Sequence, residues 1–427
     1  MNKIVNERFH ETRYEETLDN GLQVILWNKP GFQKSTFMLV TPLSGLDIDQ
    51  VDEEGNQYTF PAGIAHFLEH KMFETKDGDV MDEFSKLGAN VNAYTTYNET
   101  AYYFSTSNDY KAPLHLLLDF VQELSITKES VEKEKGIICS ELSMYQQMSD
   151  ARLYMETTAS LYKNHPLKND VGGSSDTVNG TTLEQLQQCY ELNYHPSRMV
   201  LVGVTSADPN EVFETIKENQ SKKDFKKVHH VKRMSVDEPS EVNRDEYHFS
   251  MDVSTTKISI AYKLAGIKDS EQRMKSLICL RMLEDAYFSN LNKDFQSWID
   301  EEIVNDYVGA DVDLGVDYGY LMFYSETEKI SKFKQIVEDT MHTMCQGKID
   351  ADVLNLLKRR YFGSSIRTLN RFDDIAINSA RYYFDHIDCF KSMEMLENIT
   401  LDDFKEVAKL LDNASKTVNI LEPIKCK

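Results

Sequence analysis

The 427-residue sequence predicts an α+β fold of two similar halves, each a β-sheet flanked by helices. The apolar segment 256–266 repeats the pattern of the segment 35–45, and a helix follows each of them. In both halves, two further strands and then long helices come in the same order. Residues 219–245, which separate the halves, are first rich in lysine and then acidic. Because one order of elements recurs, we expect an internal duplication.

The first half is expected to alternate strands and helices. Gly88 follows a helical segment and suits a C-cap, because glycine tolerates the left-handed backbone found there. Asn98 lies near the turn between two segments rich in aromatic and β-branched residues, a composition typical of strands. These patterns predict strands at 21–29, 35–43, 90–95, 99–106 and 198–204, and helices at 79–87, 110–124, 128–162, 182–193 and 209–219.

The second half is expected to have its own sheet and helices. We place the two domains at 1–220 and 246–427, joined by a linker at 221–245. The basic run in the linker could be a docking site, but such runs are more often solvated connectors, and we expect a connector. The sequence predicts strands at 256–266, 303–312, 317–325 and 416–421, and helices at 328–346 and 350–368.

The charge balance limits the partners of the chain. It has 70 acidic and 47 basic residues, and its formal net charge is −23 at pH 7. Nucleic acids need a basic surface and anionic lipids repel an acidic one, so we expect neither as a partner. The acidic excess could favour basic peptides, although an acidic exterior that keeps the protein soluble is the simpler interpretation.

Targeting and cysteine patterns indicate a cytoplasmic protein. No apolar run follows the first eight residues, so we expect no signal peptide. No stretch reaches the roughly 18 apolar residues of a membrane span. The six cysteines are scattered without a C-x-x-C spacing, which fits reduced thiols.

The pentapeptide that begins at His66 carries the clearest chemical signal, because it reads H-x-x-E-H. On a helix, His66 and His70 would project from one face, and two neutral imidazoles can hold a zinc ion. Glu69 would lie beside them and could take a proton from water. Pro61 suits a first helical turn. A surface helix with two solvated histidines would show the same five letters.

A catalytic zinc site needs a third protein ligand. Glu134 and Glu141 are seven residues apart, which is two helical turns, so both would lie on one face of a helix. Either could reach the metal while the other supports the site through a hydrogen bond. The spacing alone leaves both assignments open.

With these residues in place, the chain resembles the pitrilysin/insulinase family of zinc metallopeptidases, the inverzincins, whose signature is H-x-x-E-H. The resemblance implies that His66, His70 and Glu141 bind one Zn²⁺ per chain. It also implies that Glu69 is the catalytic general base and that Glu134 supports the site.

Other segments share the resemblance, which is densest from about residue 61 to residue 204. They are the segments 87–95, 163–166 and 194–196. The length resembles that of short bacterial members of the family, in which two homologous domains form half of a clamshell chamber. Only the first half of this chain carries the metal motif.

The resemblance also implies substrate contacts. Asn92 and Ala93 resemble the edge strand on which the family lays an extended peptide, although an ordinary hairpin strand would look similar. Many members carry an arginine seven residues before a substrate-contacting tyrosine. Here Tyr307 is present, but Asp300 stands where the arginine would be. Because the arginine is missing, we expect a homologous second subunit, in a heterodimer or a self-dimer. Two interpretations of Tyr307 stay open, a remnant of the substrate-contacting pair or only a core aromatic.

We predict a zinc endopeptidase that hydrolyses peptides or unfolded segments. It could remove the leader of a bacterial peptide, which short bacterial relatives do. The alternative is a non-catalytic partner subunit of such a peptidase. Because such subunits usually lose a histidine or the base, and His66, Glu69, His70 and Glu141 are all present, we favour the enzyme.

Overall fold

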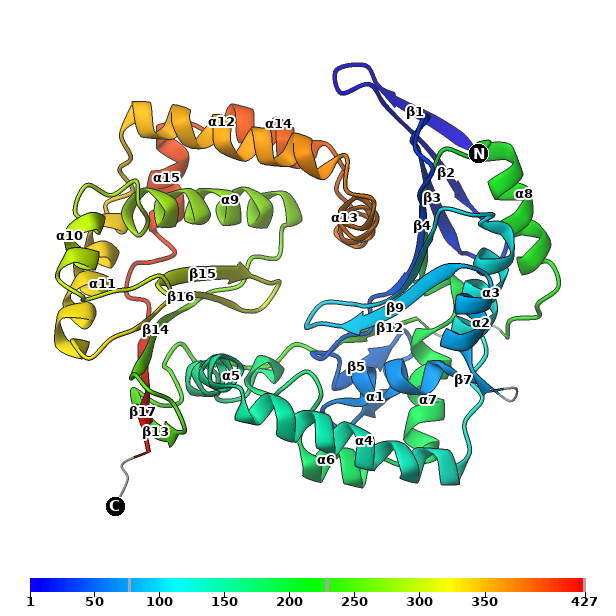
Figure 1. Ribbon diagram of the computed structural model, residues 1–427, viewed down its shortest axis with the longest axis horizontal. Coiled ribbons are helices and arrows are strands. Elements are labelled where there is room, and N and C mark those ends of the chain that lie inside the picture. Colours follow the sequence, from blue (N-terminus) through cyan, green and yellow to red (C-terminus); the bar gives the residue numbers. More distant parts are fainter. Residues whose placement is uncertain (76–77, 227–229, 425–427) are drawn as a thin grey trace. The chain divides into compact units, whose positions relative to one another are not determined.

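Two sheets with related topology organise the chain in the computed structural model, which describes residues 1–75, 78–226 and 230–424 (Figure 1). The chain divides into two compact units. Unit 1 comprises Met1–Leu142, Asp170–Met234 and Arg367–His386, and unit 2 comprises Ser143–Asn169, Ser235–Ile366 and Ile387–Lys427. Each unit thus contains a segment from the other half of the sequence. The linear domain boundaries at 220 and 246 stay a prediction.

Unit 1 is built on a seven-stranded sheet in which β9 is an edge strand. All five strands predicted in this half are present, and two N-terminal strands that the sequence did not suggest extend the sheet. In spatial order the strands are β1 (Asn2–Asn6), β2 (Glu11–Thr17), β3 (Gln23–Asn28), β11 (Val200–Thr205), β4 (Ser35–Thr41), β10 (Thr100–Thr106) and β9 (Ala89–Thr95).

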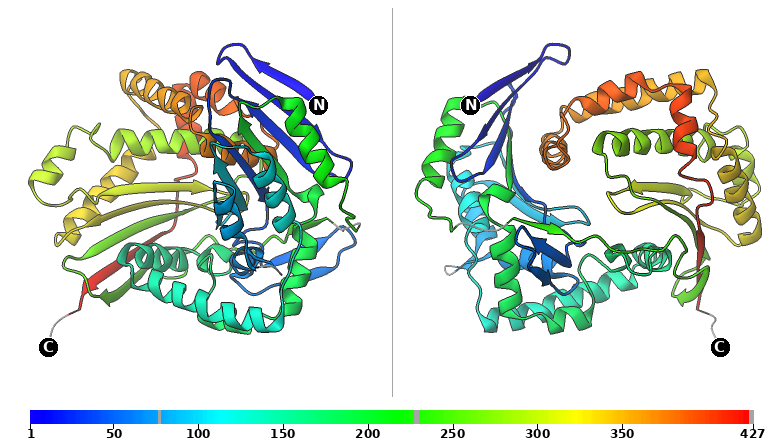
Figure 2. Two further views of the ribbon diagram at one scale, coloured as in Figure 1. Left: turned by 45° about the vertical axis from the view of Figure 1, so that its right-hand side comes forward. Right: turned by 180° about the vertical axis from the view of Figure 1, so that it is seen from behind.

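Helices cover both faces of this sheet. Every residue of β4 is buried: Phe37 and Leu39 join the main core cluster, whereas Met38 and Val40 point to the opposite face. On that face lies α13, which contacts β4 and β11 (Figure 2). The helices that lie wholly or mostly in unit 1 are α1 (Ile64–Met72), α2 (Val80–Lys86), α3 (Lys111–Val121), α4 (Lys128–Gln147), α6 (Ser175–Gly180), α7 (Leu183–Asn193), α8 (Pro209–Gln220) and α13 (Phe372–Phe384).

The single helix predicted at 128–162 is wrong, because the structure has two helices there. After α4, Met148 takes an extended backbone conformation, and a new helix, α5 (Ser149–Leu161), begins. The side chains of Leu153 and Thr157 on α5 are buried, and the helix packs against the sheet of unit 2. Tertiary packing therefore ends one helix where residue propensities would continue it.

Unit 2 has a five-stranded sheet with helices around it. In spatial order its strands are β13 (Glu246–Met251), β17 (Lys416–Pro423), β14 (Lys257–Leu264), β16 (Gly319–Glu326) and β15 (Gly309–Leu314). Besides α5, its helices are α9 (Ser270–Tyr287), α10 (Phe295–Asp300), α11 (Ile330–Met344), α12 (Ala351–Thr368, whose last two residues belong to unit 1), α14 (Lys391–Asn398) and α15 (Leu401–Ala408).

The two sheets repeat one strand arrangement. The order β3-β11-β4-β10-β9 of unit 1 corresponds to β13-β17-β14-β16-β15 of unit 2. In each, the first two strands pair in parallel and the remaining neighbours pair antiparallel. This shared topology supports the internal duplication expected from the sequence.

The strand predicted at 303–312 begins only at Gly309, so the prediction is wrong for its first six residues. Glu302 has a left-handed backbone (φ 51°) and ends the turn after α10. The N–H groups of Ile303 and Val304 both donate to the carbonyl oxygen of Trp298 (2.8 and 3.3 Å). Their backbone donors are therefore used in a helix-terminal turn, although their side chains are typical of strands.

Part of the expected linker is structured. Strand β12 (Val231–Arg233) pairs with β5 (Asp49–Asp52), which pairs with β6 (Gln57–Thr59). A further two-stranded ribbon consists of β7 (Glu74–Thr75) and β8 (Gly78–Asp79). Residues 227–229 of the basic run, and Cys426 among the cysteines, lie outside the described residues.

Glu238, also from the expected linker, is anchored in unit 2. Its carboxylate accepts the backbone N–H groups of three consecutive residues, Lys163 (2.9 Å), Asn164 (2.6 Å) and His165 (2.7 Å), and pairs with the Lys263 ammonium. The side chains of Glu238 and Lys263 are 8% and 6% exposed. The acidic end of the expected linker therefore makes a fixed structural contact within unit 2.

We expect Glu238→Gln to destabilise the protein by about 3–5 kcal/mol, because it leaves the buried Lys263 ammonium unpaired. Burial acts to raise the pKa of Glu238, but Lys263 and the three N–H donors outweigh it and lower that pKa below the ordinary value of 4.5. The carboxylate therefore contributes its full stabilisation above about pH 4.5 and loses it as the pH falls through the lowered pKa.

Thermal unfolding of wild type and Glu238→Gln between pH 3 and pH 7 measures this difference. The difference in thermal midpoint between wild type and Glu238→Gln should be largest near neutral pH and should become smaller in acid. Glu406→Gln removes a carboxylate from an exposed ion pair with Lys409 and should change the midpoint little. An equal effect of both substitutions would contradict the anchoring role of Glu238.

Candidate metal centre

Helix α1 holds the H-x-x-E-H motif. Phe67 and Leu68 are buried in the core of unit 1, which fixes the helix and turns the motif side chains away from that core. The chain enters α1 through Gly63, which has a φ of 92°. A Cβ at Gly63 would lie 2.3 Å from the carbonyl oxygen of Gly172, so this close approach between two chain segments requires glycine.

The structure brings His66, His70 and Glu141 together. Glu141 Oε2 lies 3.3 Å from His70 Nε2 and 3.8 Å from His66 Nε2. One ligand atom from each of the three residues lies within 4.8 Å of the other two. Tetrahedral zinc with ligand bonds of 2.0–2.2 Å separates its ligands by roughly 3.4 Å. The donor set and its spacing therefore fit a zinc ion, and α1 and α4 supply the ligands.

Glu134 occupies a different position in the same cluster. Its Oε1 is 3.1 Å from His70 Nδ1, on the side of the imidazole ring away from Glu141. A ring that donates its Nδ1 proton to a carboxylate presents Nε2 to a metal. Lys71, which is 1% exposed, pairs with Glu74 and lies 3.6 Å from Glu134 Oε2. Glu134 thus orients His70, and Lys71 balances its charge.

Glu69 lies beside the cluster and is held by Thr95. The Thr95 hydroxyl on β9 donates to Glu69 Oε2 at 2.7 Å. Burial raises the pKa of Glu69, and the nearby charge of Glu141 acts in the same direction. Thr95 was not among the site residues predicted from the sequence. The signal was available in the segment 87–95, whose last residue it is, but nothing there indicated a contact with α1.

Burial and neighbouring charges set the protonation of the other groups. Burial lowers the pKa of His66 to about 4, with a further contribution from His70, so its imidazole is neutral at pH 7. Burial also acts to lower the pKa of His70, but the hydrogen bond to Glu134 and three nearby carboxylates raise it. Burial acts to raise the pKa of Glu134, but the bond from His70 and the charge of Lys71 lower it.

The edge strand β9 presents backbone groups next to this cluster. Thr96 N donates to Glu99 O (2.9 Å), which makes them a hydrogen-bonded pair at the end of the β9–β10 ladder. In an antiparallel ladder, hydrogen-bonded and non-hydrogen-bonded residue pairs alternate. Ala93 and Tyr102 therefore form a non-hydrogen-bonded pair, and the N–H and C=O of Ala93 point to the open edge of the sheet. The Asn92 side chain supports this, because its oxygen accepts the outward Ala93 N–H at 2.8 Å.

The two residues singled out in the second half lie in unit 2. Tyr307 packs under the Lys257 ammonium (3.9 Å to the ring centroid) and against Tyr324 (5.5 Å between centroids), and its hydroxyl bonds to Asp150. Asp300 ends α10 and accepts a hydrogen bond from Gln296 (2.9 Å). These contacts give Tyr307 a packing role, and its contact with substrate stays a prediction.

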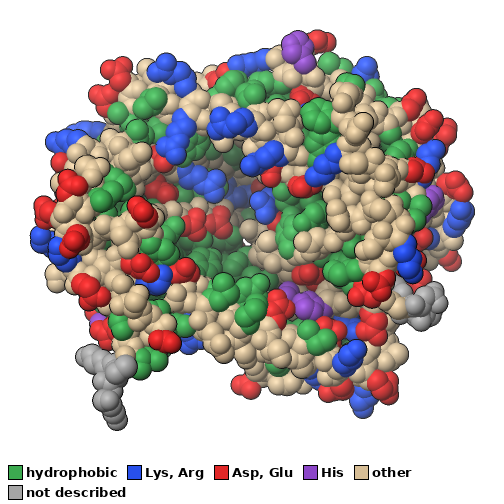
Figure 3. All heavy atoms as spheres, in the orientation of Figure 1, with side chains coloured by type: hydrophobic (Ala, Val, Ile, Leu, Met, Phe, Trp, Pro, Cys, Tyr) green, Lys and Arg blue, Asp and Glu red, His purple; other side chains and the backbone are tan. Residues whose placement is uncertain are grey.

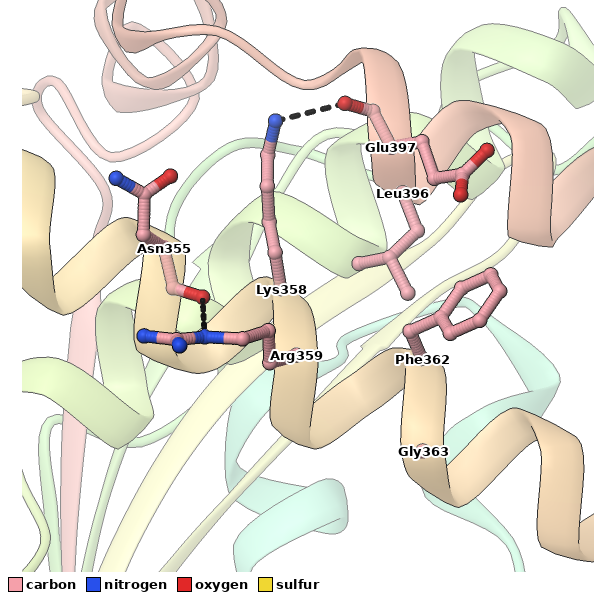
Figure 4. A pocket seen from close by; sticks show the side chains of 7 residues that line it. All are labelled: Asn355, Lys358, Arg359, Phe362, Gly363, Leu396 and Glu397. Atoms are coloured by element: carbon pink, nitrogen blue, oxygen red, sulfur yellow. Dashed lines mark hydrogen bonds between the residues drawn. The ribbon is translucent and has the colours of Figure 1, made fainter.

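A groove between α12 and α14 in unit 2 is a different kind of site (Figure 4). Its volume is about 620 Å³, and its lining residues are Asn355, Lys358, Arg359, Phe362, Gly363, Leu396 and Glu397. Lys358 donates to the carbonyl oxygen of Glu397 (2.8 Å), and Arg359 donates to that of Asn355 (3.2 Å). Its two cations are thus engaged by neighbouring backbone, and the lining residues lack the ligand set of the His66 cluster.

Two family models match the chain. Residues 55–175 match the model of the insulinase family, peptidase family M16, and residues 181–361 match the model named the peptidase M16 inactive domain. In the described part of the chain, one candidate metal cluster is found, and its residues all lie within the first match. No helix within residues 1–75, 78–226 and 230–424 is long and apolar enough to cross a bilayer.

Two related proteins and one solved structure match different shares of the chain. An uncharacterized zinc protease of Bacillus subtilis, YmfH, is 33% identical over 408 residues, which are 95% of each chain. A probable beta subunit of the mitochondrial-processing peptidase of Schizosaccharomyces pombe is 30% identical over 46% of this chain and 42% of its own. The crystal structure of an M16-like peptidase from Alicyclobacillus acidocaldarius matches with a TM-score of 0.92 at 30% identity, covering 97% of this chain and 99% of that one.

Proposed function

Because the chain belongs to the insulinase family of peptidases, M16, we propose that it is a zinc-dependent endopeptidase acting on peptides or unfolded segments. One observation carries the proposal. The ligand atoms of His66, His70 and Glu141 converge, and the half-buried carboxyl group of Glu69 lies close enough to Glu141 and His70 for their charges to affect its pKa. Three ligands and an adjacent base that is not one of them are what metal-assisted hydrolysis requires.

Each residue then has a role in hydrolysis. His66, His70 and Glu141 would hold one zinc ion, and Glu134 would orient His70. When bound, zinc lowers the pKa of water and polarises a carbonyl group. Glu69 accepts a proton from the attacking water and returns it to the leaving amine, while Thr95 fixes one oxygen of its carboxylate.

The open edge of β9 would bind the substrate as an added strand. The N–H and C=O groups of Ala93 point outward, so an extended peptide can pair with them regardless of its side chains. In the protein alone the Asn92 side chain occupies that N–H, and it would have to give way to a substrate carbonyl. Such binding favours peptides and unfolded segments over folded proteins.

We expect Ala93→Pro to lower kcat/KM at least about tenfold, because proline removes the outward N–H and obstructs the edge. The ladder with β10 does not use this N–H, so the sheet should persist. Ala93→Val keeps the N–H and should retain activity. Kinetics with an unstructured peptide and zinc analysis on both variants measure the difference, and equal activity of the two would contradict strand addition.

The decisive experiment is hydrolysis of an unstructured peptide mixture by the purified chain alone, with its zinc content measured on the same sample. Cleavage would support a self-sufficient peptidase. Bound zinc without cleavage would point to a missing partner, for which a homologous second subunit or a self-dimer is the proposal. Two observations motivate it: Asp300 stands at the family's arginine position, and one relative is named a subunit. A chain that neither binds zinc nor cleaves would support the non-catalytic alternative.

Peptide processing such as leader removal, and a cytoplasmic location, complete the proposal. Acidic and basic side chains are interspersed over the face of the molecule that Figure 3 shows. This distribution fits the interpretation that the net charge of −23 keeps the exterior soluble. That distribution does not select basic peptides. Neighbouring genes for a precursor peptide and its modifying enzymes would favour a dedicated processing role.

A further inference from the structure

The turn between β9 and β10 is tied to a helix from the other end of the sequence. The side chain of Glu99 in this turn is 2% exposed. Two nitrogens of the Arg381 guanidinium group on α13 donate hydrogen bonds to its carboxylate. Arg381 Nη2 donates to Glu99 Oε1 (2.6 Å), and Arg381 Nε donates to Glu99 Oε2 (3.2 Å). A paired geometry of this kind fixes both position and orientation of the carboxylate.

From Glu99 the contacts continue to the base. Glu99 Oε1 also accepts the Thr96 hydroxyl (3.1 Å), and Thr96 N donates to Glu99 O (2.9 Å). Thr96 O in turn accepts the N–H of Gly45 (2.9 Å), which holds the turn from the other side. Thr95 is the next residue along the strand, and its hydroxyl donates to Glu69. All of these residues belong to unit 1.

We propose that Arg381 is a positioning residue for the general base, acting through Glu99 and the β9–β10 turn to place the Thr95 hydroxyl against Glu69. The inference rests on the proposed function for the role of Glu69. It adds that the second half of the sequence supplies a residue on which the geometry of the first half's active site depends. Arg381 itself contacts neither the base nor the three candidate ligands, so it is not a catalytic residue.

The test compares Arg381→Met with Ser379→Ala. Ser379 lies on the same helix and accepts the indole N–H of the buried Trp27 (2.9 Å), so its loss loosens the docking of α13 without touching the turn. We expect Arg381→Met to lower kcat between about 10- and 100-fold at unchanged zinc content, because small displacements of catalytic groups are costly. Ser379→Ala should lower kcat less than about twofold, since it leaves the β9–β10 turn intact.

A double-mutant cycle separates positioning from general stability. If Arg381 acts through Thr95, the double variant Arg381→Met/Thr95→Val should have a kcat less than about twofold below that of Thr95→Val alone. The reason is that Thr95→Val already removes the hydroxyl through which Arg381 would act. Additive losses, or a loss with Ser379→Ala equal to that with Arg381→Met, would overturn the proposal. Arg381→Met leaves the buried Glu99 carboxylate without its arginine, which could unfold the variant. The double variant Glu99→Gln/Arg381→Met removes that charge as well and should show the same loss of kcat.

Hydrogen exchange keeps the proposal testable without activity. The backbone amides of Thr96, which donates within the turn, and of Gly45, which donates to Thr96 O, should exchange at least about tenfold faster in Arg381→Met than in Ser379→Ala, because the turn loses its anchor. If the chain neither binds zinc nor cleaves peptide, the proposed function fails. In that case exchange alone decides whether Arg381 anchors the turn. Unchanged exchange in an active enzyme would overturn this inference and leave the proposed function standing.

Discussion

Replacing Glu69 by glutamine should lower kcat by about 10²–10⁴-fold and leave zinc bound, because the substitution removes the proton acceptor and none of the three candidate ligands. The amide oxygen of glutamine can still accept the Thr95 hydroxyl, so the local geometry should be kept. Glu69 is half-buried, and its partial removal from water raises its pKa, which disfavours the charged form. A neutral amide therefore should not reduce the stability of the fold.

The measurement is cleavage of an unstructured peptide together with zinc content and thermal midpoint on the same preparation. Glu83→Gln on α2 removes a carboxylate that is 57% exposed and pairs with Lys86 on the same helix, and it should leave all three readouts unchanged. If Glu69→Gln retained more than about a tenth of wild-type turnover, Glu69 would not be the base.

The second large effect concerns the two glutamates of α4. We expect Glu141→Gln to weaken zinc binding by more than about 100-fold, because it removes one of three protein ligands, and Glu134→Gln to weaken it by about 10- to 100-fold. The reason for the difference is geometric. Glu141 faces Nε2 of both histidines, whereas Glu134 binds Nδ1 of His70 only.

Competition for zinc against a chelator of known affinity measures both variants. Glu132→Gln is the matched control, since Glu132 lies on the same helix, is 59% exposed and pairs with Lys135. Its affinity for zinc should equal that of wild type. A larger loss with Glu134→Gln than with Glu141→Gln would reverse the assignment of ligand and supporting residue that the sequence spacing left open.

Sequence analysis was most successful where the signal is local. The helix with His66 and His70 and the strands with alternating or β-branched residues depend on neighbours in the chain, and they are present as expected. Thr95 on Glu69 and Arg381 on Glu99 are contacts across 26 and 282 positions. No pattern in a single sequence indicates such contacts, because the sequence does not show which distant residues the fold brings together.

The family resemblance supplied part of the information that local sequence patterns do not contain. It favoured Glu141 over Glu134 as a ligand, which helical spacing could not do, and the structure places Glu141 at the two Nε2 atoms. It gave no information on Glu238, whose role depends on three backbone N–H groups and Lys263 that lie far from it in sequence. The break between α4 and α5 was missed for the same reason, since the packing of α5 on another sheet causes it.

The position of α13 on the first sheet has a consequence for how the protein is made. Thr205 ends β11, and α13 begins 167 residues later at Phe372. At the roughly 5–20 residues per second of synthesis, a ribosome needs on the order of ten seconds to cover that distance. Throughout that time the sheet face with Met38 and Val40 has no helix to cover it. The nascent chain therefore carries an apolar surface that chaperones can hold, and the fold is completed late in translation.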